Sequence, residues 1–279
     1  MSNRWGINLW NWVNELGPEC EGLPEKAFKM GFTAVELPMT VPELPKGLVK
    51  EIRSLDMEIS LCACLGAGRD LSNFDETIRQ DTMKYMIECL KSAESVSAKI
   101  FAGPLYTGGG KRHRLSEDDK KREWELAVTG IRKVSAAAKE CGVRLALEPL
   151  NRYRTSVVNT AAQALKLVSD IGEENVGVHF DSYQAGIEED SILNAFEAVL
   201  EEGKLYHFHA CSNNRGVPGQ GFFPWEGLWN LMEKYDYRGH ITMETFAAGG
   251  FDAGWIESEK NRDEIAEAGI RYMRQHDWH

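Results

Sequence analysis

Four polar residues stand at the ends of four successive apolar runs in the second half of this 279-residue chain. They are Glu148 after "RLAL", Asp181 after "VGVHF", His209 in "LYHFHAC" and Glu244 after "HITM". A carboxylate at the end of a buried segment is unfavourable unless it is paired or binds a cation. Three carboxylates and one imidazole that converge would form an oxygen-rich site for Mn²⁺, Mg²⁺ or Co²⁺, whereas zinc usually prefers more nitrogen or sulfur.

Each of these residues alone has a simpler explanation. A single acid that ends a strand often caps the next helix, and a single histidine in "HFH" is often a hydrogen-bonded core residue. Four consecutive strands that end in this way favour a shared metal site. His207 and His179 lie two residues before His209 and Asp181 and therefore share their faces of the strands. We expect these two histidines to pack beneath the site rather than to bind the ion.

Further side chains near these strand ends could contact a substrate. Arg215 lies six residues after His209 in the loop "SNNRGVPGQG", and its guanidinium can reach substrate oxygens. Phe246, two residues after Glu244, is expected either as an apolar wall for a substrate or as a core residue. The aromatic residues of "WNW" (10–12) and "HDWH" (276–279) are expected to be exposed, at an interface or in a lid over the site.

Short apolar runs alternate with amphipathic stretches along the whole chain and predict the elements that position these residues. The expected strands are 5–10, 34–37, 58–65, 98–106, 144–150, 176–181, 205–211 and 240–246. The expected helices include 76–96, 122–142, 159–172 and a last one near 254–275. Gly142 and Gly172 follow the second and third of these helices as stop signals, and Asn159 is placed as an N-cap.

Eight strands in alternation with about as many helices predict parallel β/α units. Eight such units close most simply into a (β/α)8 TIM barrel, so we expect an α/β fold with a single TIM-barrel domain over residues 1–279. A doubly wound open sheet is the alternative, and the lack of a G-x-G-x-x-G sequence after the first strand disfavours it. TIM barrels carry their chemistry at the carboxyl ends of the strands, where the four polar residues stand.

The composition excludes several classes of protein. The net charge of −11 argues against nucleic acid as a partner, and "GGGKRHR" (108–114) is expected to be a solvated loop. No run approaches the roughly 18 apolar residues of a membrane span, and the first residues do not form a signal peptide, so the cytoplasm is the expected location. The six cysteines lack the spacing of a zinc cluster and are expected to be reduced thiols.

Several motifs resemble those of the xylose-isomerase-like barrels. They are "FAGPLY", "EPLNRY", "VGVHFDSY", "HACSNNRGVPGQG" and "ITMETF", and the resemblance extends over essentially the whole chain. The ketose 3-epimerases of the tagatose and allulose (psicose) type are the most similar group. The resemblance implies an enzyme of carbohydrate metabolism that acts on a small sugar or polyol and often forms dimers or tetramers.

The resemblance also implies roles for individual residues. Glu148, Asp181, His209 and Glu244 would hold a Mn²⁺- or Co²⁺-type ion, and the two glutamates would double as the acid and base. Arg215 would bind substrate oxygens. The chemistry agrees with this assignment, because an ion chelated by a ketone and the neighbouring hydroxyl acidifies the adjacent C–H bond. One glutamate could then remove the proton from one face of the sugar, while the other returns a proton to the opposite face.

Two positions differ from the pattern of the ketose 3-epimerases. Gln184, three residues after the aspartate of the sixth strand, stands where these enzymes usually carry a histidine. Arg154, six residues after the glutamate of the fifth strand, stands where they usually carry a glutamate. Both positions normally contact the substrate near its carbonyl end. Arg154 in place of an acid would favour a substrate with a carboxylate, or a bulkier keto-sugar such as an oxidised inositol or a glycoside.

The first hypothesis is therefore a metal-dependent epimerase or isomerase of a keto-sugar or keto-polyol. A lyase that eliminates a group from a 3-keto sugar could use the same site. A phosphodiester-cleaving nuclease also shares this barrel, but the seven histidines and the net charge of −11 disfavour it. A catalytically silent protein that binds a sugar or a partner protein is the fourth alternative.

Overall fold

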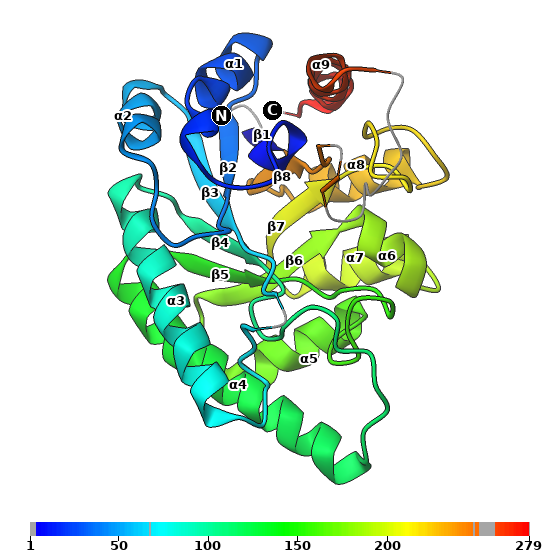
Figure 1. Ribbon diagram of the computed structural model, residues 1–279. Helices are drawn as coiled ribbons and strands as arrows, with labels where there is room; N and C mark the ends of the chain where they lie inside the picture. Colours follow the sequence, from blue (N-terminus) through cyan, green and yellow to red (C-terminus); the bar gives the residue numbers. More distant parts are fainter. Residues whose placement is uncertain (1–3, 67, 248, 251–259, 279) are drawn as a thin grey trace.

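The computed structural model describes residues 4–278 apart from 67, 248 and 251–259. Eight parallel strands form a closed barrel in the order in which they follow one another in the chain, and helices surround it (Figure 1). The predicted TIM barrel is confirmed, and the doubly wound sheet is wrong. The strands are β1 (Arg4–Asn8), β2 (Ala34–Pro38), β3 (Glu58–Cys62), β4 (Ile100–Gly103), β5 (Arg144–Leu147), β6 (Val176–Asp181), β7 (Leu205–Ala210) and β8 (His240–Met243).

An α-helix follows each of the eight strands, and β6 is followed by two. The described α-helices are α1 (Leu23–Met30), α2 (Lys46–Ser54), α3 (Glu76–Ser95), α4 (Glu117–Glu140), α5 (Ala161–Ile171), α6 (Ser182–Glu188), α7 (Ile192–Glu201), α8 (Trp225–Lys234) and α9 (Arg262–Met273). None of them is long and apolar enough to cross a bilayer. That residues 1–279 form one domain stays a prediction, because both termini lie outside the described residues.

Two helices begin at other residues than predicted, because side chains cap them at unexpected positions. The hydroxyl of Ser116 caps α4, which therefore begins five residues before the predicted position 122. Thr160 and Gln163 form a capping box at the start of α5, so the prediction of Asn159 as the N-cap is wrong. The side-chain amide of Asn159 instead donates to two backbone carbonyls of the preceding loop, at 2.7 and 2.9 Å. The last helix was expected near residues 254–275, and residues 254–259 of this range lie outside the described residues.

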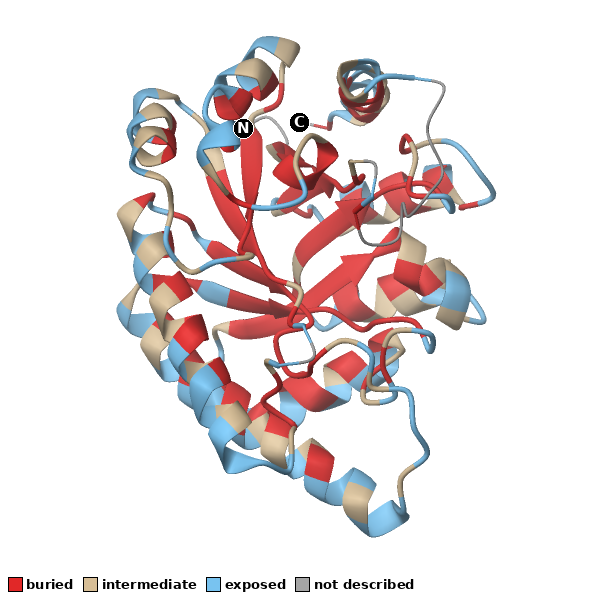
Figure 2. Cartoon of the chain, viewed as in Figure 1, coloured by how far each residue is buried: buried red, intermediate tan, exposed pale blue. Residues whose placement is uncertain are grey.

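The register of the last three strands brings their polar ends together. Asp181 pairs with His209 across β6 and β7, and Ala210 pairs with Met243 across β7 and β8, so that Glu244 follows directly. The strands are buried along almost their whole length (Figure 2), because barrel residues on one face and helices on the other cover them. This burial on both faces explains why the strands are continuous apolar runs rather than alternating ones.

Gly103, the last residue of β4, occupies a position that fits only glycine. Its φ is +119°, and a Cβ there would lie 2.2 Å from the carbonyl oxygen of Ala63. Because that oxygen belongs to the backbone next to β3, it cannot move away cheaply. We expect Gly103→Ala to lower the free energy of unfolding by more than about 2 kcal/mol in urea denaturation. Gly142→Ala, at φ +66° with open space around it, is the matched control and should lower it by only about 1 kcal/mol. Equal losses would contradict the role of the close contact.

Candidate functional site

Glu148, Asp181, His209 and Glu244 all lie at the carboxyl ends of their strands, and all four are buried. Asp181 ends β6, and His209 is the next-to-last residue of β7. The two glutamates are the first residues after β5 and β8. Their backbone amides still donate to the neighbouring strands, at 3.0 Å for Glu148 and 3.2 Å for Glu244. The backbone hydrogen bonds between neighbouring strands thus extend one residue beyond β5 and β8, and they fix both glutamates at the rim of the barrel.

Three of these residues bring potential ligand atoms together. One such atom each from Asp181, His209 and Glu244 lies within 4.8 Å of the others. His209 Nδ1 is 3.3 Å from Glu244 Oε1 and 4.0 Å from Asp181 Oδ2, and it makes no hydrogen bond to the described residues. Glu148 lies in the same cavity but outside this group, with Oε2 3.7 Å from His179 Nδ1. A buried imidazole nitrogen that faces two carboxylates suits a divalent cation.

The guanidinium of Arg215 lies between the same two carboxylates. Its Nη1 is 2.7 Å from Asp181 Oδ2 and 2.7 Å from Glu244 Oε2. The side chain is buried, and its guanidinium carbon lies 4.0 Å from the ring centre of Tyr183. The backbone of Arg215 has a φ of +59°, which is uncommon for a residue other than glycine. The two acids therefore form a cation site in which the chain itself supplies the positive charge.

Glu36, in the middle of β2, holds the other side of His209. Its Oε1 is 2.6 Å from His209 Nε2 and accepts from the Asn8 amide at 2.7 Å. Its Oε2 accepts from the Ser60 hydroxyl at 2.9 Å and is 2.7 Å from His207 Nε2. These contacts, and above all the two imidazoles, hold the pKa of Glu36 well below its usual range despite full burial. An acceptor at Nε2 places the proton of a neutral His209 there and directs the Nδ1 lone pair toward Asp181 and Glu244.

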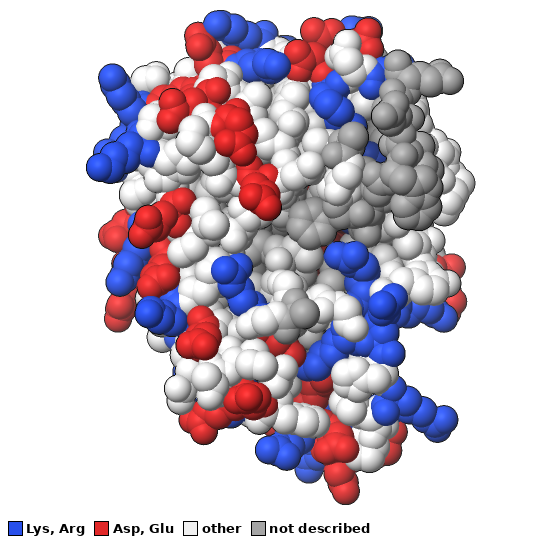
Figure 3. Space-filling view, viewed as in Figure 1, with Lys and Arg blue, Asp and Glu red and all other residues white. Residues whose placement is uncertain are grey.

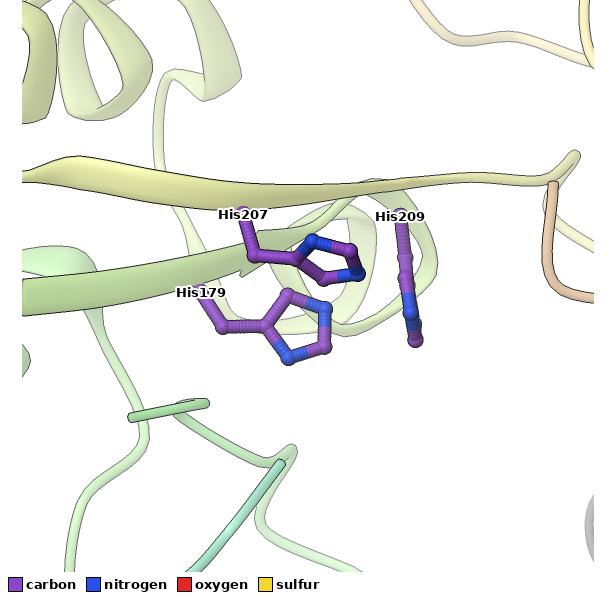
Figure 4. Close-up of side chains that lie close together, drawn as sticks. All are labelled: His179, His207 and His209. Carbon is purple, nitrogen blue, oxygen red and sulfur yellow. The ribbon is translucent and has the colours of Figure 1, made fainter. Parts of the chain in front are cut away.

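His179, His207 and His209 lie side by side inside the barrel, on β6 and β7 (Figure 4). Their ring centres are 4.0 to 5.0 Å apart. Burial lowers the pKa of His179 well below its usual value and that of His207 to about 4. His209 differs, because the charges of Glu244 and Glu36 outweigh burial and raise its pKa well above the usual value. Of these three histidines, His209 is therefore the one in which the attraction of carboxylates outweighs the effect of burial on the pKa.

The two glutamates of the site ionise differently. Burial, together with the charges of Asp181 and Glu244, raises the pKa of Glu148 well above its usual value. Burial also acts on Glu244, but the charges of His209 and Arg215 outweigh it and lower the pKa. The surroundings of the two glutamates thus shift their pKa values in opposite directions, a division suited to acid and base roles.

All four side chains predicted to contact a substrate line the same cavity as Glu148 and Glu244: Arg215, Gln184, Arg154 and Phe246. Gln184 Oε1 accepts from the backbone amide of Asn151 at 2.9 Å and from its side-chain amide at 2.6 Å. This arrangement leaves the amide nitrogen of Gln184 as a donor for a ligand. Arg154 contacts the thiol of Cys64, another residue of the cavity wall.

Two aromatic predictions are wrong. Trp10 and Trp278 are buried, not exposed. Trp10 lines the cavity and packs on Phe246 with ring centres 5.6 Å apart, so Phe246 is both a cavity wall and part of a small apolar cluster. Trp278 packs edge-on against Trp5 at 6.3 Å. The position of Trp10 just after β1, at the carboxyl end of the barrel, is the signal that could have assigned it to the site.

The comparisons with known proteins agree with this geometry. The family model described as the xylose isomerase-like TIM barrel matches residues 24–276. The D-psicose 3-epimerase of Ruminiclostridium cellulolyticum is 28% identical over 96% of each chain. A crystal structure of D-psicose 3-epimerase with D-tagatose from Clostridium cellulolyticum H10 superposes with a TM-score of 0.88 over 98% of both chains, at 28% identity. The 3-dehydro-D-guloside 4-epimerase of Escherichia coli is 26% identical over 77% of this chain and 83% of its own length.

The fold and the site define an α/β-barrel protein with acidic residues gathered at the carboxyl ends of its strands. The chain belongs to the xylose isomerase-like TIM barrel family, and the resemblance to the ketose 3-epimerases is confirmed. Because the matches extend over nearly the whole chain and the relatives are epimerases, the protein is an enzyme.

Proposed function

We propose that the protein is a divalent-metal-dependent sugar epimerase that moves a proton at the carbon next to a ketone. The observation that supports it best is the convergence of Asp181, His209 and Glu244 on one cation position, with Glu148 in the same cavity. The relatives named as 3-epimerases and 4-epimerases support the reaction class.

The proposed ligands of the ion are Glu148, Asp181, His209 and Glu244, and Mn²⁺ is the proposed ion, with Co²⁺ and Mg²⁺ as alternatives. The buried Nδ1 of His209 fits this role, because it faces carboxylate oxygens of Glu244 and Asp181 at 3.3 and 4.0 Å. The guanidinium of Arg215 between the same carboxylates supports this choice, because a positive charge already lies there. A bound ion would act as a Lewis acid that makes the C–H bond beside the ketone acidic enough to be broken.

Glu148 and Glu244 are the proposed acid and base. They come from β5 and β8, which are not neighbours in the barrel, so their carboxylates reach the cavity from different sides. The ionised glutamate removes the proton from one face of the sugar, and the protonated one delivers a proton to the opposite face. The configuration of that carbon is thereby inverted, and the two glutamates exchange protonation states.

The proposed substrate is a keto-sugar or keto-polyol, held by Arg215, Gln184, Arg154 and Phe246. Phe246 and Trp10 offer an apolar wall, while Gln184 and the two arginines offer donors for substrate oxygens. The positive charge of Arg154 favours a substrate with a carboxylate or a bulkier keto-sugar. The Escherichia coli relative, whose name specifies a 3-dehydro-guloside, supports the second of these classes. Action in the cytoplasm and assembly as a homodimer or homotetramer stay predictions.

A panel of keto-sugars, keto-inositols and sugar acids tests this function. Each compound is incubated in D₂O with the Mn²⁺-loaded protein, and the recovered material is analysed by NMR. Deuterium at the inverted carbon, without loss of a leaving group, is the expected result. Elimination of a group would instead favour the lyase, and a lack of exchange in every compound would contradict the proposal.

Glu36→Gln is expected to weaken Mn²⁺ binding by about 10- to 100-fold. A glutamine must present its NH₂ group to one of the two histidines that now share the carboxylate, and in either orientation it lacks the negative charge that makes His209 a stronger ligand. Calorimetric titration of the metal-free variant measures the affinity. Ser60→Ala removes only one contact to the other oxygen and should bind within about threefold of the wild type. Wild-type affinity in the Glu36 variant would exclude this role.

A further inference from the structure

A largely buried ion-pair cluster, formed by two loops and helix α4, lies beside the cavity and has no part in the proposed proton transfer. Lys111, in the loop between β4 and α4, places Nζ 2.8 Å from Asp70 Oδ2 and 2.7 Å from Glu123 Oε1. The same nitrogen donates to the Ser72 hydroxyl at 2.7 Å. Three acceptors match the three donors of an ammonium group, so the side chain is held in one place.

Lys111 differs from the other residues of "GGGKRHR". Only 13% of its side chain is exposed, whereas Arg112, His113 and Arg114 are exposed. Charged residues of both signs are interspersed over the surface in view (Figure 3). A largely buried ammonium group that faces carboxylates gains little stability, because its desolvation offsets most of the attraction. Its burial therefore points to a role in fixing the loop.

The backbone around Lys111 joins three loops of the barrel rim. Lys111 forms an isolated parallel bridge with Thr155, in the loop after β5. The amide of Gly110 donates to the carbonyl of Arg154 at 3.0 Å. The amide of Gly109 donates at 2.7 Å to a carbonyl of the loop after β3. Lys111 thus fixes the segment to which the backbone of Arg154 is attached.

The side chain of Arg154 extends from this junction into the cavity wall. It contacts the thiol of Cys64, which belongs to the loop after β3. Asp70 and Ser72, which hold the ammonium group of Lys111, stand in that same loop. Both the backbone and the side chain of Arg154 are therefore supported by segments that meet at Lys111.

We propose that Lys111 is a positioning residue for Arg154 and thereby sets how tightly the cavity holds its substrate. The inference rests on the proposed function, because Arg154 contacts the substrate only under that proposal. Lys111 itself lies outside the cavity and acts on binding rather than on the proton transfer.

A double-mutant cycle tests the coupling. Lys111→Met is expected to raise KM by about tenfold and to leave kcat within about threefold, as loss of ground-state binding does. In a protein that already carries Arg154→Met, the same substitution should raise KM no further. Hydrogen exchange at the Gly110 amide should become faster in Lys111→Met, while Mn²⁺ affinity stays at the wild-type value. Lys120→Met, which removes an exposed lysine at the start of α4, is the matched control and should change none of these quantities.

Lys111→Met leaves two buried carboxylates without a counter-charge. If that variant does not fold, the triple variant Lys111→Met, Asp70→Asn, Glu123→Gln removes the charges together and should show the same rise in KM. Equal rises in KM with and without Arg154→Met would overturn the inference. If no sugar exchanges deuterium with the wild-type protein, the proposed function fails separately. Unchanged hydrogen exchange at Gly110 would then overturn the positioning role by itself.

Discussion

Glu148→Gln and Glu244→Gln are each expected to lower kcat by about 10²- to 10⁴-fold, the range that a positioned acid or base contributes. Both glutamates are buried in one cavity, and their surroundings shift their pKa values in opposite directions. An amide can neither accept nor release the proton, so inversion of the carbon centre should slow by this factor in either variant. The measurement is kcat with the substrate found by deuterium exchange.

The two variants should also differ from each other. Each retains one glutamate, so each should still exchange deuterium into the epimer whose C–H bond faces that glutamate, without forming the other epimer. Mn²⁺ content has to be determined alongside, since both residues are proposed ligands. Glu197→Gln, on α7 in an exposed ion pair with Lys234, is a matched control that should keep wild-type activity. Turnover near the wild-type rate in either glutamine variant would exclude the assigned roles and favour the silent binding protein.

Removal of the metal is expected to have a comparable effect. Dialysis against a chelator should lower turnover by at least about 10³-fold, because the C–H bond next to a ketone is too weakly acidic to be broken unaided. Addition of Mn²⁺ should restore it. An ion at about 100 times its dissociation constant adds about 2.7 kcal/mol of stability, which corresponds to a rise in Tm of about 5 °C for a chain of this size.

The rise in Tm provides a measurement that does not depend on the substrate. Asp181→Asn removes a charge from the cation position and should reduce the rise to a small fraction of the wild-type value. Ser191→Ala, which removes the exposed N-cap of α7, lowers stability without affecting the ion and serves as the control. Full turnover in chelator, with no metal retained, would rule out the metal-dependent mechanism.

The barrel and its polar strand ends could be predicted from the sequence, because both signals are local. A strand buried on both faces is an apolar run, and a carboxylate at its end interrupts that run visibly. Gln184, Arg154 and Arg215 were predicted from motifs, and the structure brings all three to one cavity. Their roles toward a substrate remain predictions.

Glu36 could not be predicted, because its meaning depends on contacts across the barrel. It stands within the apolar run "AVEL", and its imidazole partners follow more than 170 residues later in the chain. The proposed role of Lys111 could not be predicted from the sequence for a similar reason. Its sequence neighbours are exposed charges, and the acids that surround it come from the loop after β3 and from α4. Such contacts become visible only when the strands are closed into a ring.

Under the proposed function, the position of Arg215 makes the binding of a metal ion an exchange of one cation for another. The guanidinium contacts oxygens of Asp181 and Glu244, which an incoming ion would also need. The measured free energy of Mn²⁺ binding is therefore the favourable free energy of the contacts between the ion and its ligands, reduced by the free energy needed to move the Arg215 guanidinium out of the site. Arg215→Ala would remove this competing cation. The variant should therefore bind Mn²⁺ more tightly than the wild type, although it binds the substrate more weakly.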